Sequence, residues 1–347
     1  MKKLGLILLA MFFTGAAGAA TTLKIATVTP EGSQWMQDMR ATSAEIKAAT
    51  DGRVVIKYYG GGSQGTDSTV LKRMSRGALH GGVFTPSALM ERYPDIGLYG
   101  LPMVFDSAED ATYVRDRMDK KLAAGLEEAG FVSFGFAATG FAMMMSNEPV
   151  AGLEDLRGKR VWVPEGDAVS KATMDALGVN PIPLPLTDVY TALQTGALDI
   201  IAMSSVGAVI LQYHTKLKYV TDLPLVYTMG LMVVDKRAFA KISAADQTIV
   251  RQKLASLYAR YDVSNLEDEA EAKQALFNAG MQRIVPGEEQ LVQLRSVLSK
   301  SNEAMAAKGI VSAEYYAEMM RYIKERRADS ETIARADEKL GENLAVE

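Results

Sequence analysis

The side chains that could do chemistry in this chain are carboxylates and aromatic rings, because the usual catalytic residues are scarce. The sequence has no cysteine and only two histidines, His80 and His214. Thiolate nucleophiles, disulfides and thiolate metal sites are therefore excluded, and a histidine-rich metal centre is not expected. We expect both histidines to be ordinary polar residues and the protein to fold without metal.

Nothing in the sequence assembles a catalytic or nucleic-acid-binding site. The glycine-rich segment 60–66 lacks the lysine that a phosphate-binding loop requires. The 42 acidic residues cannot be sorted into a catalytic pair from the sequence alone. A formal net charge of −4 gives no electrostatic basis for binding nucleic acid. We therefore expect neither an enzyme nor a cofactor.

The N-terminus predicts export. Lys2 and Lys3 precede an apolar run over 4–13 and a stretch of small residues over 15–20, which is typical of a secretory signal peptide. The apolar run is shorter than the roughly 20 residues that a membrane span needs. We therefore expect residues 1–19 to be a signal peptide and the mature protein to be periplasmic.

Alternating strand and helix patterns predict two α/β units. A chain of 347 residues is also longer than one hydrophobic core usually serves. In the first unit, strands are predicted over 23–28 and 54–59, and helices over 33–50 and 67–75. In the second unit, the predicted extended segments are 161–164, 181–185 and 197–203, and the helices are 168–177 and 188–195. This order is typical of mainly parallel sheets flanked by helices.

The segment 243–279 contains neither proline nor glycine and opens with a helix-capping pattern at Ser243. One helix of this length would reach about 55 Å, further than one lobe is wide. We expect a single helix that spans both units; the alternative is two helices with a bend near 263–265. A further helix is predicted over 304–326, followed by a charged tail over 328–347.

Three motifs make the second unit specific: LRGKRVWVP at 156–164, ALGVNPIPL at 176–184 and DVYTALQTGALD at 188–199. In order and spacing they resemble the DctP-like solute-binding proteins of TRAP (tripartite ATP-independent periplasmic) transporters. Weaker similarities extend over essentially the whole chain after the signal. The resemblance implies a two-lobed α/β periplasmic binding protein that captures a small organic solute in the cleft between its lobes. It also implies hinge closure and delivery to a TRAP-type membrane permease.

The resemblance also implies how the chain is divided. We expect lobe I to comprise residues 20–140 and 230–268, and lobe II residues 141–229 and 269–347. Gly140 and Gly230 lie at two of the crossings between the lobes, where a residue without Cβ permits a backbone change. We expect a monomer.

The chain departs from its family where a carboxylate is usually held. Most members place an arginine in the strand that here reads 161–164, and the matching residue is Trp162. Two other positions that are often polar correspond to Ala142 and Met203. A guanidinium pairs two donors with both oxygens of a carboxylate, so its loss predicts a ligand with an apolar or aromatic surface.

We expect the cleft to be lined by these positions and by others that face them by family position. Carboxylates beside an aromatic wall would also suit a cation. The candidate ligand-binding residues are Trp162, Met203, Ala142, Met144, Trp35, Phe84, Thr85, Phe105, Glu165, Asp167 and Tyr190.

Several alternatives stay open. Trp162, Met144 and Met203 could simply be core, or a shift of one residue could make Arg160 the carboxylate anchor. An organic acid could instead be held by an unrecognised base, such as Arg73, Arg76 or Lys171. The chain could also be a periplasmic accessory protein that has lost solute binding, in which case the cleft would be absent or filled.

Overall fold

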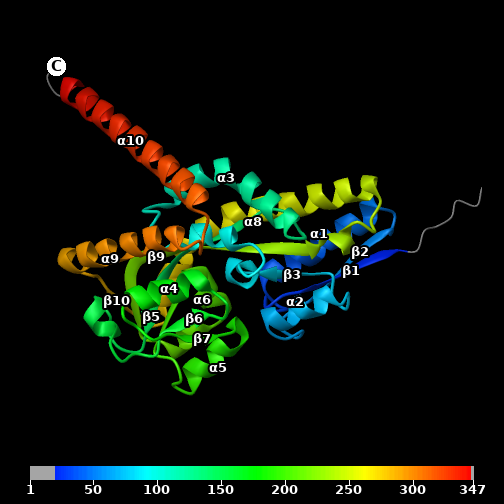
Figure 1. The fold of residues 1–347 in the computed structure, drawn as a ribbon, viewed down its shortest axis with the longest axis horizontal. Helices are drawn as coiled ribbons and strands as arrows, with labels where there is room; N and C mark the ends of the chain where they lie inside the picture. Colours follow the sequence, from blue (N-terminus) through cyan, green and yellow to red (C-terminus); the bar gives the residue numbers. More distant parts are fainter. Residues whose placement is uncertain (1–19, 345–347) are drawn as a thin grey trace, which may run out of the picture.

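The structure is a computed structural model that describes residues 20–344, with side chains as far as residue 329. The signal peptide predicted for residues 1–19 lies outside this range. Among the described residues, no helix is both long and apolar enough to cross a membrane. Two groups of strands share one long strand, β9 (Tyr219–Asp235), and helices cover them (Figure 1).

In the first group, parallel strands lie side by side in the order β2 (Val54–Tyr59), β1 (Thr21–Ala26) and β3 (Gly81–Phe84). β3 and β4 (Phe131–Ser133) both pair antiparallel with the C-terminal end of β9. The helices of this group are α1 (Gln34–Ala49), α2 (Asp67–Ser75), α3 (Ala108–Glu128) and the short α7 (Lys236–Phe239). β2 and α2 have the predicted limits.

In the second group, β5 (Ala137–Ser146) lies antiparallel between β9 and β8 (Ile200–Met203), and β10 (Gln282–Ile284) pairs with the other edge of β9. A separate parallel pair, β6 (Trp162–Pro164) and β7 (Ile182–Leu184), is linked to β8 by a bridge from Val161 to Ile200. The helices here are α4 (Ala168–Ala176), α5 (Val189–Gln194) and α6 (Ser205–Ile210).

The predicted long helix is continuous: α8 (Ala244–Asn278) has 35 residues without a bend-forming break, so the two-helix alternative is wrong. Its first half packs Leu254 and Leu257 into a hydrophobic cluster with Ile25 of β1. Its second half packs Leu276 into a cluster with Met143 and Ile201 of the other group. The two-lobed α/β fold with a helix spanning both lobes is therefore confirmed.

The two crossing strands are irregular where they leave lobe I. The pairing of β5 with β9 shifts register between Ala138 and Gly140 and again between Ala142 and Met144. Gly140 has a φ of +90°, which side chains rarely adopt, so this crossing requires glycine. Gly230 has no such positive φ, and its hydrogen-bonded pairing with Ala137 is regular. The need for glycine thus holds at one crossing, and the hinge itself stays a prediction.

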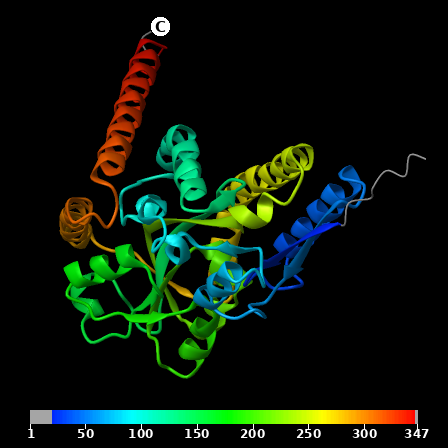
Figure 2. The same cartoon turned by 45° about the vertical axis from the view of Figure 1, so that its right-hand side comes forward.

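The C-terminal region differs from its prediction. The helix expected over 304–326 is broken at 308–312, where Gly309, with a φ of +72°, ends α9 (Glu288–Ala307). Ser312 then accepts a hydrogen bond from the Tyr315 amide at the start of α10 (Ala313–Leu344). The expected tail from residue 328 is helical as far as Leu344. α10 lies against α3 and extends away from the sheets (Figures 1 and 2).

Candidate functional site

A cleft of about 670 Å³ lies between the two lobes. One wall comes from lobe I, through the ends of β1 and β3 and the helix α2. The other comes from lobe II, through the segment after β6 and the junction of β8 with α6. The crossing strands and α8 close it behind. This volume falls within the roughly 300–1,000 Å³ typical of small-molecule pockets.

Trp162 is part of the lobe II wall. Its ring lines the cleft, is only 6 % exposed and packs against Val189 and Leu193 of α5. Its indole Nε1 donates to the carbonyl of Leu184 at 3.0 Å, on the neighbouring strand β7. The side chain is therefore core and cleft wall at once, because one face of the ring packs inward while another borders the cavity.

The other two positions where the family is often polar lie beside it. Ala142 and Met203 both line the cleft, on the paired strands β5 and β8. Met144 does not line it: its side chain packs against Val150 and Leu156 in a separate cluster. The register shift between Ala142 and Met144 is the physical reason, since a bulge changes which face successive side chains take.

On the lobe I wall, Trp35 is held by α8. Its indole Nε1 donates to Asn265 Oδ1 at 3.1 Å, and the Tyr261 hydroxyl donates to the Trp35 carbonyl at 2.7 Å. Asn265 Nδ2 in turn donates to the carbonyl of Ala138 on β5 at 2.7 Å. The wall, the long helix and the crossing strand are thus joined by one chain of hydrogen bonds.

Phe84 and Thr85 also line the cleft, whereas Phe105 and Tyr190 do not. Phe105 is 2 % exposed and meets the edge of Tyr227, with the ring centroids 5.6 Å apart, so it lies behind a residue of the lining. Tyr190 sits on α5 outside the cavity, with Lys216 Nζ 5.2 Å from its ring centroid. The ligand-binding role of every candidate residue remains a prediction.

The acidic candidates lie at the point where the lobes meet. Asp167 accepts hydrogen bonds from the amide and hydroxyl of Ser170, both at 2.9 Å, and Glu165 lines the same loop. Burial raises the pKa of Asp167. Across the cleft, burial and then the charge of Glu165 raise the pKa of Asp67 to about 6. Sequence reasoning treated Asp67 only as a helix start, because its approach to Glu165 depends on how the lobes are placed.

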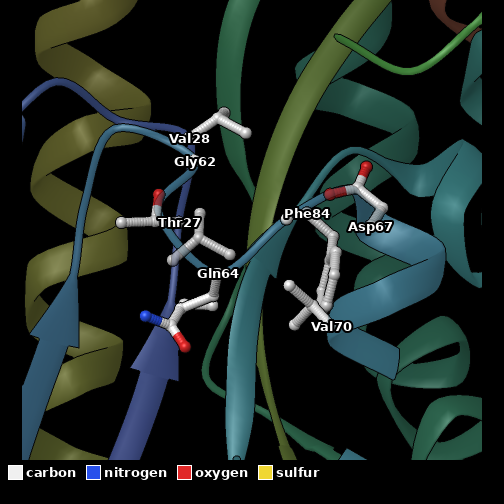
Figure 3. A pocket seen from close by; sticks show the side chains of 10 residues that line it. Thr27, Val28, Gly62, Gln64, Asp67, Val70 and Phe84 are labelled. Atoms are coloured by element: carbon white, nitrogen blue, oxygen red, sulfur yellow. The ribbon is translucent and has the colours of Figure 1, made fainter. Parts of the chain in front are cut away.

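A small recess opens off the cleft beside Asp67. Figure 3 shows Asp67, Phe84 and Val70 on one side of it and Thr27 and Gln64 on the other. Its volume of about 10 Å³ is enough for one water molecule at most. The recess is therefore too small for an organic solute, whereas the larger cleft is not.

The basic residues considered from the sequence lie elsewhere. Arg73, Arg76 and Lys171 do not line the cleft, and Lys171 pairs with Asp175 at 2.7 Å. Arg160 is held by Asp199, with Nε 2.8 Å from Oδ2, so it does not replace the family arginine. Among the described residues, the cations in the lining are Lys72 and Arg92, and both are exposed.

The lobes touch across the mouth of the cleft. Val169 of α4 packs into a lobe I cluster with Val70 and Met74 of α2. A Cβ added to Gly62 would lie 3.0 Å from Thr187 Cγ2 of lobe II.

The fold and the cleft together define a two-lobed binding protein. The family model described as bacterial extracellular solute-binding protein, family 7 (DctP), matches residues 25–308. The chain therefore belongs to this family, the solute receptors of TRAP transporters, which are transport receptors and not enzymes.

Relatives of known and unknown role span nearly the whole chain. An uncharacterized protein of Haemophilus influenzae is 25 % identical over 301 residues, covering 83 % of this chain and 88 % of the relative. The sialic acid-binding periplasmic protein SiaP of Vibrio cholerae is 20 % identical over 325 residues, covering 90 % and 98 %. The sugar acid binding protein DctPAm of Advenella mimigardefordensis, solved with galactonate, has a TM-score of 0.81 at 20 % identity, covering 88 % and 99 %. At this identity the structural likeness supports the fold alone.

Proposed function

We propose that this protein captures a small organic solute in the interlobe cleft, closes around it by hinge bending and delivers it to a TRAP-type membrane permease in the periplasm. The observation that carries the proposal is the cleft of about 670 Å³ between two lobes of a DctP-family chain. Closing it brings residues of both lobes around a bound molecule, as a clamp requires.

We propose further that no arginine on β6 holds the solute. Trp162 occupies that position, and Ala142 and Met203 extend the same wall without a formal charge. This wall offers an apolar and aromatic surface instead of a guanidinium fork. We take the closing lobes to be 20–140 with 230–268 and 141–229 with 269–347, except that α10 packs against α3 of lobe I.

A receptor for an organic acid is the second candidate. The names of two similar proteins favour it, because one binds sialic acid and another was solved with galactonate. In this chain such an acid would have to use Lys72 or Arg92, which are exposed. The accessory-protein alternative is weaker. It predicts an absent or filled cleft, whereas this chain has a cleft of about 670 Å³.

A thermal-shift screen of a broad metabolite library tests the proposal, because a solute that binds only the folded form raises the melting temperature. We expect at least one small organic molecule to raise it and to lower the radius of gyration measured by small-angle scattering. A library without any such molecule, or a tight solute that leaves the radius of gyration unchanged, contradicts the proposal.

A further inference from the structure

Side chains of the protein itself pair with the first amides of the helices that begin around the cleft. Helix N-termini attract anions because their first amides are unpaired and the helix dipole is positive there. At α4 the carboxylate of Asp167 already accepts from the Ser170 amide at 2.9 Å. At α6 the carboxylate of Glu269, reaching over from α8, accepts from the amides of Ser205 and Val206 at 3.2 and 3.4 Å.

The third helix that begins at the cleft, α2, also has its N-terminus capped by side chains of the protein. Thr66 caps it by accepting from the Thr69 amide at 3.3 Å, and Asp67 adds a negative charge in its first turn. At the N-termini of α2, α4 and α6, an incoming carboxylate would therefore have to compete with side chains that already pair with the helix amides. It would also meet the carboxylates of Asp67, Glu165 and Asp167, which line the cleft and repel it.

The aromatic walls offer ring surface and not donors. The indole N–H of Trp162 is taken by the Leu184 carbonyl, and that of Trp35 by the Asn265 side chain. What remains for a solute is the face and apolar edge of each ring. A ring face attracts cations through its quadrupole and packs against apolar groups, but it cannot hold a carboxylate.

Two carboxylates of the cleft lack a counter-charge. Asp67 belongs to lobe I and Glu165 to lobe II, both line the same cleft, and the charge of Glu165 contributes to the raised pKa of Asp67. In the described part of the chain, neither side chain has an ion pair or a hydrogen bond to another side chain. Closure brings these like charges together. A cation between them offsets their repulsion and links the two lobes.

We propose that the solute is an organic cation with an apolar body. Its charge lies between Asp67 and Glu165, and its body packs against Trp162 and Phe84. The inference rests on the proposed function, because it names the chemical class of the molecule that the same cleft captures. A protein of the same fold that has a carboxylate-binding arginine is expected to bind an anion. The solute proposed here carries the opposite charge.

Pairs of molecules that differ in charge test the inference most sharply. The screen compares choline with its uncharged isostere 3,3-dimethylbutan-1-ol, 2-phenylethylammonium with 2-phenylethanol, and a wider set of alkyl- and arylalkylammonium ions with galactonate and sialic acid. We expect at least one ammonium ion to raise the melting temperature, by about 4 °C at a hundred times its Kd. Its uncharged partner should give a much smaller shift, and the acids none.

Two isosteric variants then assign the charge. Asp67→Asn and Glu165→Gln should each lower the affinity for the ammonium ion found in the screen by tenfold or more, measured by calorimetry. Asp175→Asn and Glu154→Gln are the matched controls, because they remove one negative charge each from exposed positions outside the cleft lining. They should leave the affinity within twofold. Circular dichroism checks that each variant is folded.

The outcomes separate this inference from the proposed function. An acid or an uncharged molecule that binds and closes the lobes, while no ammonium ion does, overturns the inference and leaves the receptor intact. An ammonium ion that binds equally well to Asp67→Asn and Glu165→Gln also overturns it. If no solute of any class raises the melting temperature, the result contradicts both the inference and the proposed function.

Discussion

The two walls of the cleft each carry one tryptophan, but they are held in different ways. Trp162 is fixed within lobe II, by the core around α5 and by a carbonyl on the adjacent strand. Trp35 is partly buried and is fixed by α8, through residues more than 220 positions away in the chain. The lobe II wall is therefore a local, rigid surface, whereas the lobe I wall depends on the helix that spans both lobes.

The largest expected effect comes from removing the rigid wall. Trp162→Ala should lower the free energy of unfolding by about 3–5 kcal/mol, because a nearly buried ring leaves a cavity in the lobe II core. It should also weaken solute binding by more than about tenfold, since stacking surface is lost. Urea denaturation and calorimetry measure the two effects. A variant as stable as the wild type would show that Trp162 is not a core residue.

Matched Trp→Phe changes sharpen the comparison between the walls. Trp35→Phe leaves Oδ1 of the buried Asn265 without a donor, which should cost about 1–2 kcal/mol of unfolding free energy. Trp162→Phe removes one of two donors to the carbonyl of Leu184, which keeps its hydrogen bond from the Glu165 amide at 3.2 Å, so it should cost less. Denaturation of both variants under one set of conditions decides the order, and equal costs would break the distinction.

Restoring the family residue tests what the lobe II wall selects. Trp162→Arg should weaken binding of the native solute and create affinity for simple carboxylates such as galactonate, because a guanidinium donates to both carboxylate oxygens. The gain should be modest, about tenfold or less in Kd, because Ala142 and Met203 still lack polar groups. Calorimetric titration of galactonate into variant and wild type measures it. Tight binding of galactonate by the wild type would contradict this account of the wall.

The smallest effect concerns charge at the mouth of the cleft. The pKa of Asp67 is raised to about 6, above its ordinary value of 3.8, so the folded protein holds this proton more tightly than the unfolded chain does. Its contribution to stability is present below about pH 4 and is lost as the pH rises through about 6. Asp67→Asn should therefore stabilise the solute-free protein at pH 7 by at most about 1 kcal/mol, given solvent screening, and have no effect near pH 3.5.

Melting curves between pH 3.5 and 8 check this sign. Asp175→Asn serves as the control, because it changes the same chemical group at an exposed position. A difference between Asp67→Asn and the wild type that does not vary with pH would mean that Asp67 is solvated and that the carboxylates do not approach in solution.

Much of the fold could be predicted because its signals are local. The limits of β2 and α2 follow from turn residues on each side, and α8 follows from a long segment without proline or glycine. The break between α9 and α10 was missed, although Gly309 was a visible signal for it. A single glycine is ambiguous in a sequence, since helices tolerate it at a modest cost.

The site was predictable in part. Trp162, Ala142 and Met203 were found because the family motif fixes their positions, and all three line the cleft. The prediction that Met144 lines the cleft was wrong because a bulge between Ala142 and Met144 turns its side chain away from the cleft. No local sequence pattern reveals this bulge. Asp67 and Asn265 were missed because their roles arise from contacts between distant segments, and a single sequence does not encode these contacts locally.

The central claim is that the lobes close on a solute, and the distance between them tests it most directly. The chain has no cysteine, so Ala48→Cys on α1 and Gln194→Cys on α5 place two spin labels at exposed positions, one on each lobe. Ala48→Cys with Arg76→Cys labels lobe I alone and is the control. On adding a solute from the screen, pulsed electron paramagnetic resonance should show that the mean interlobe distance shortens and that the distribution of distances narrows. The control distance should stay unchanged. An interlobe distance that stays the same at saturating solute would contradict the account.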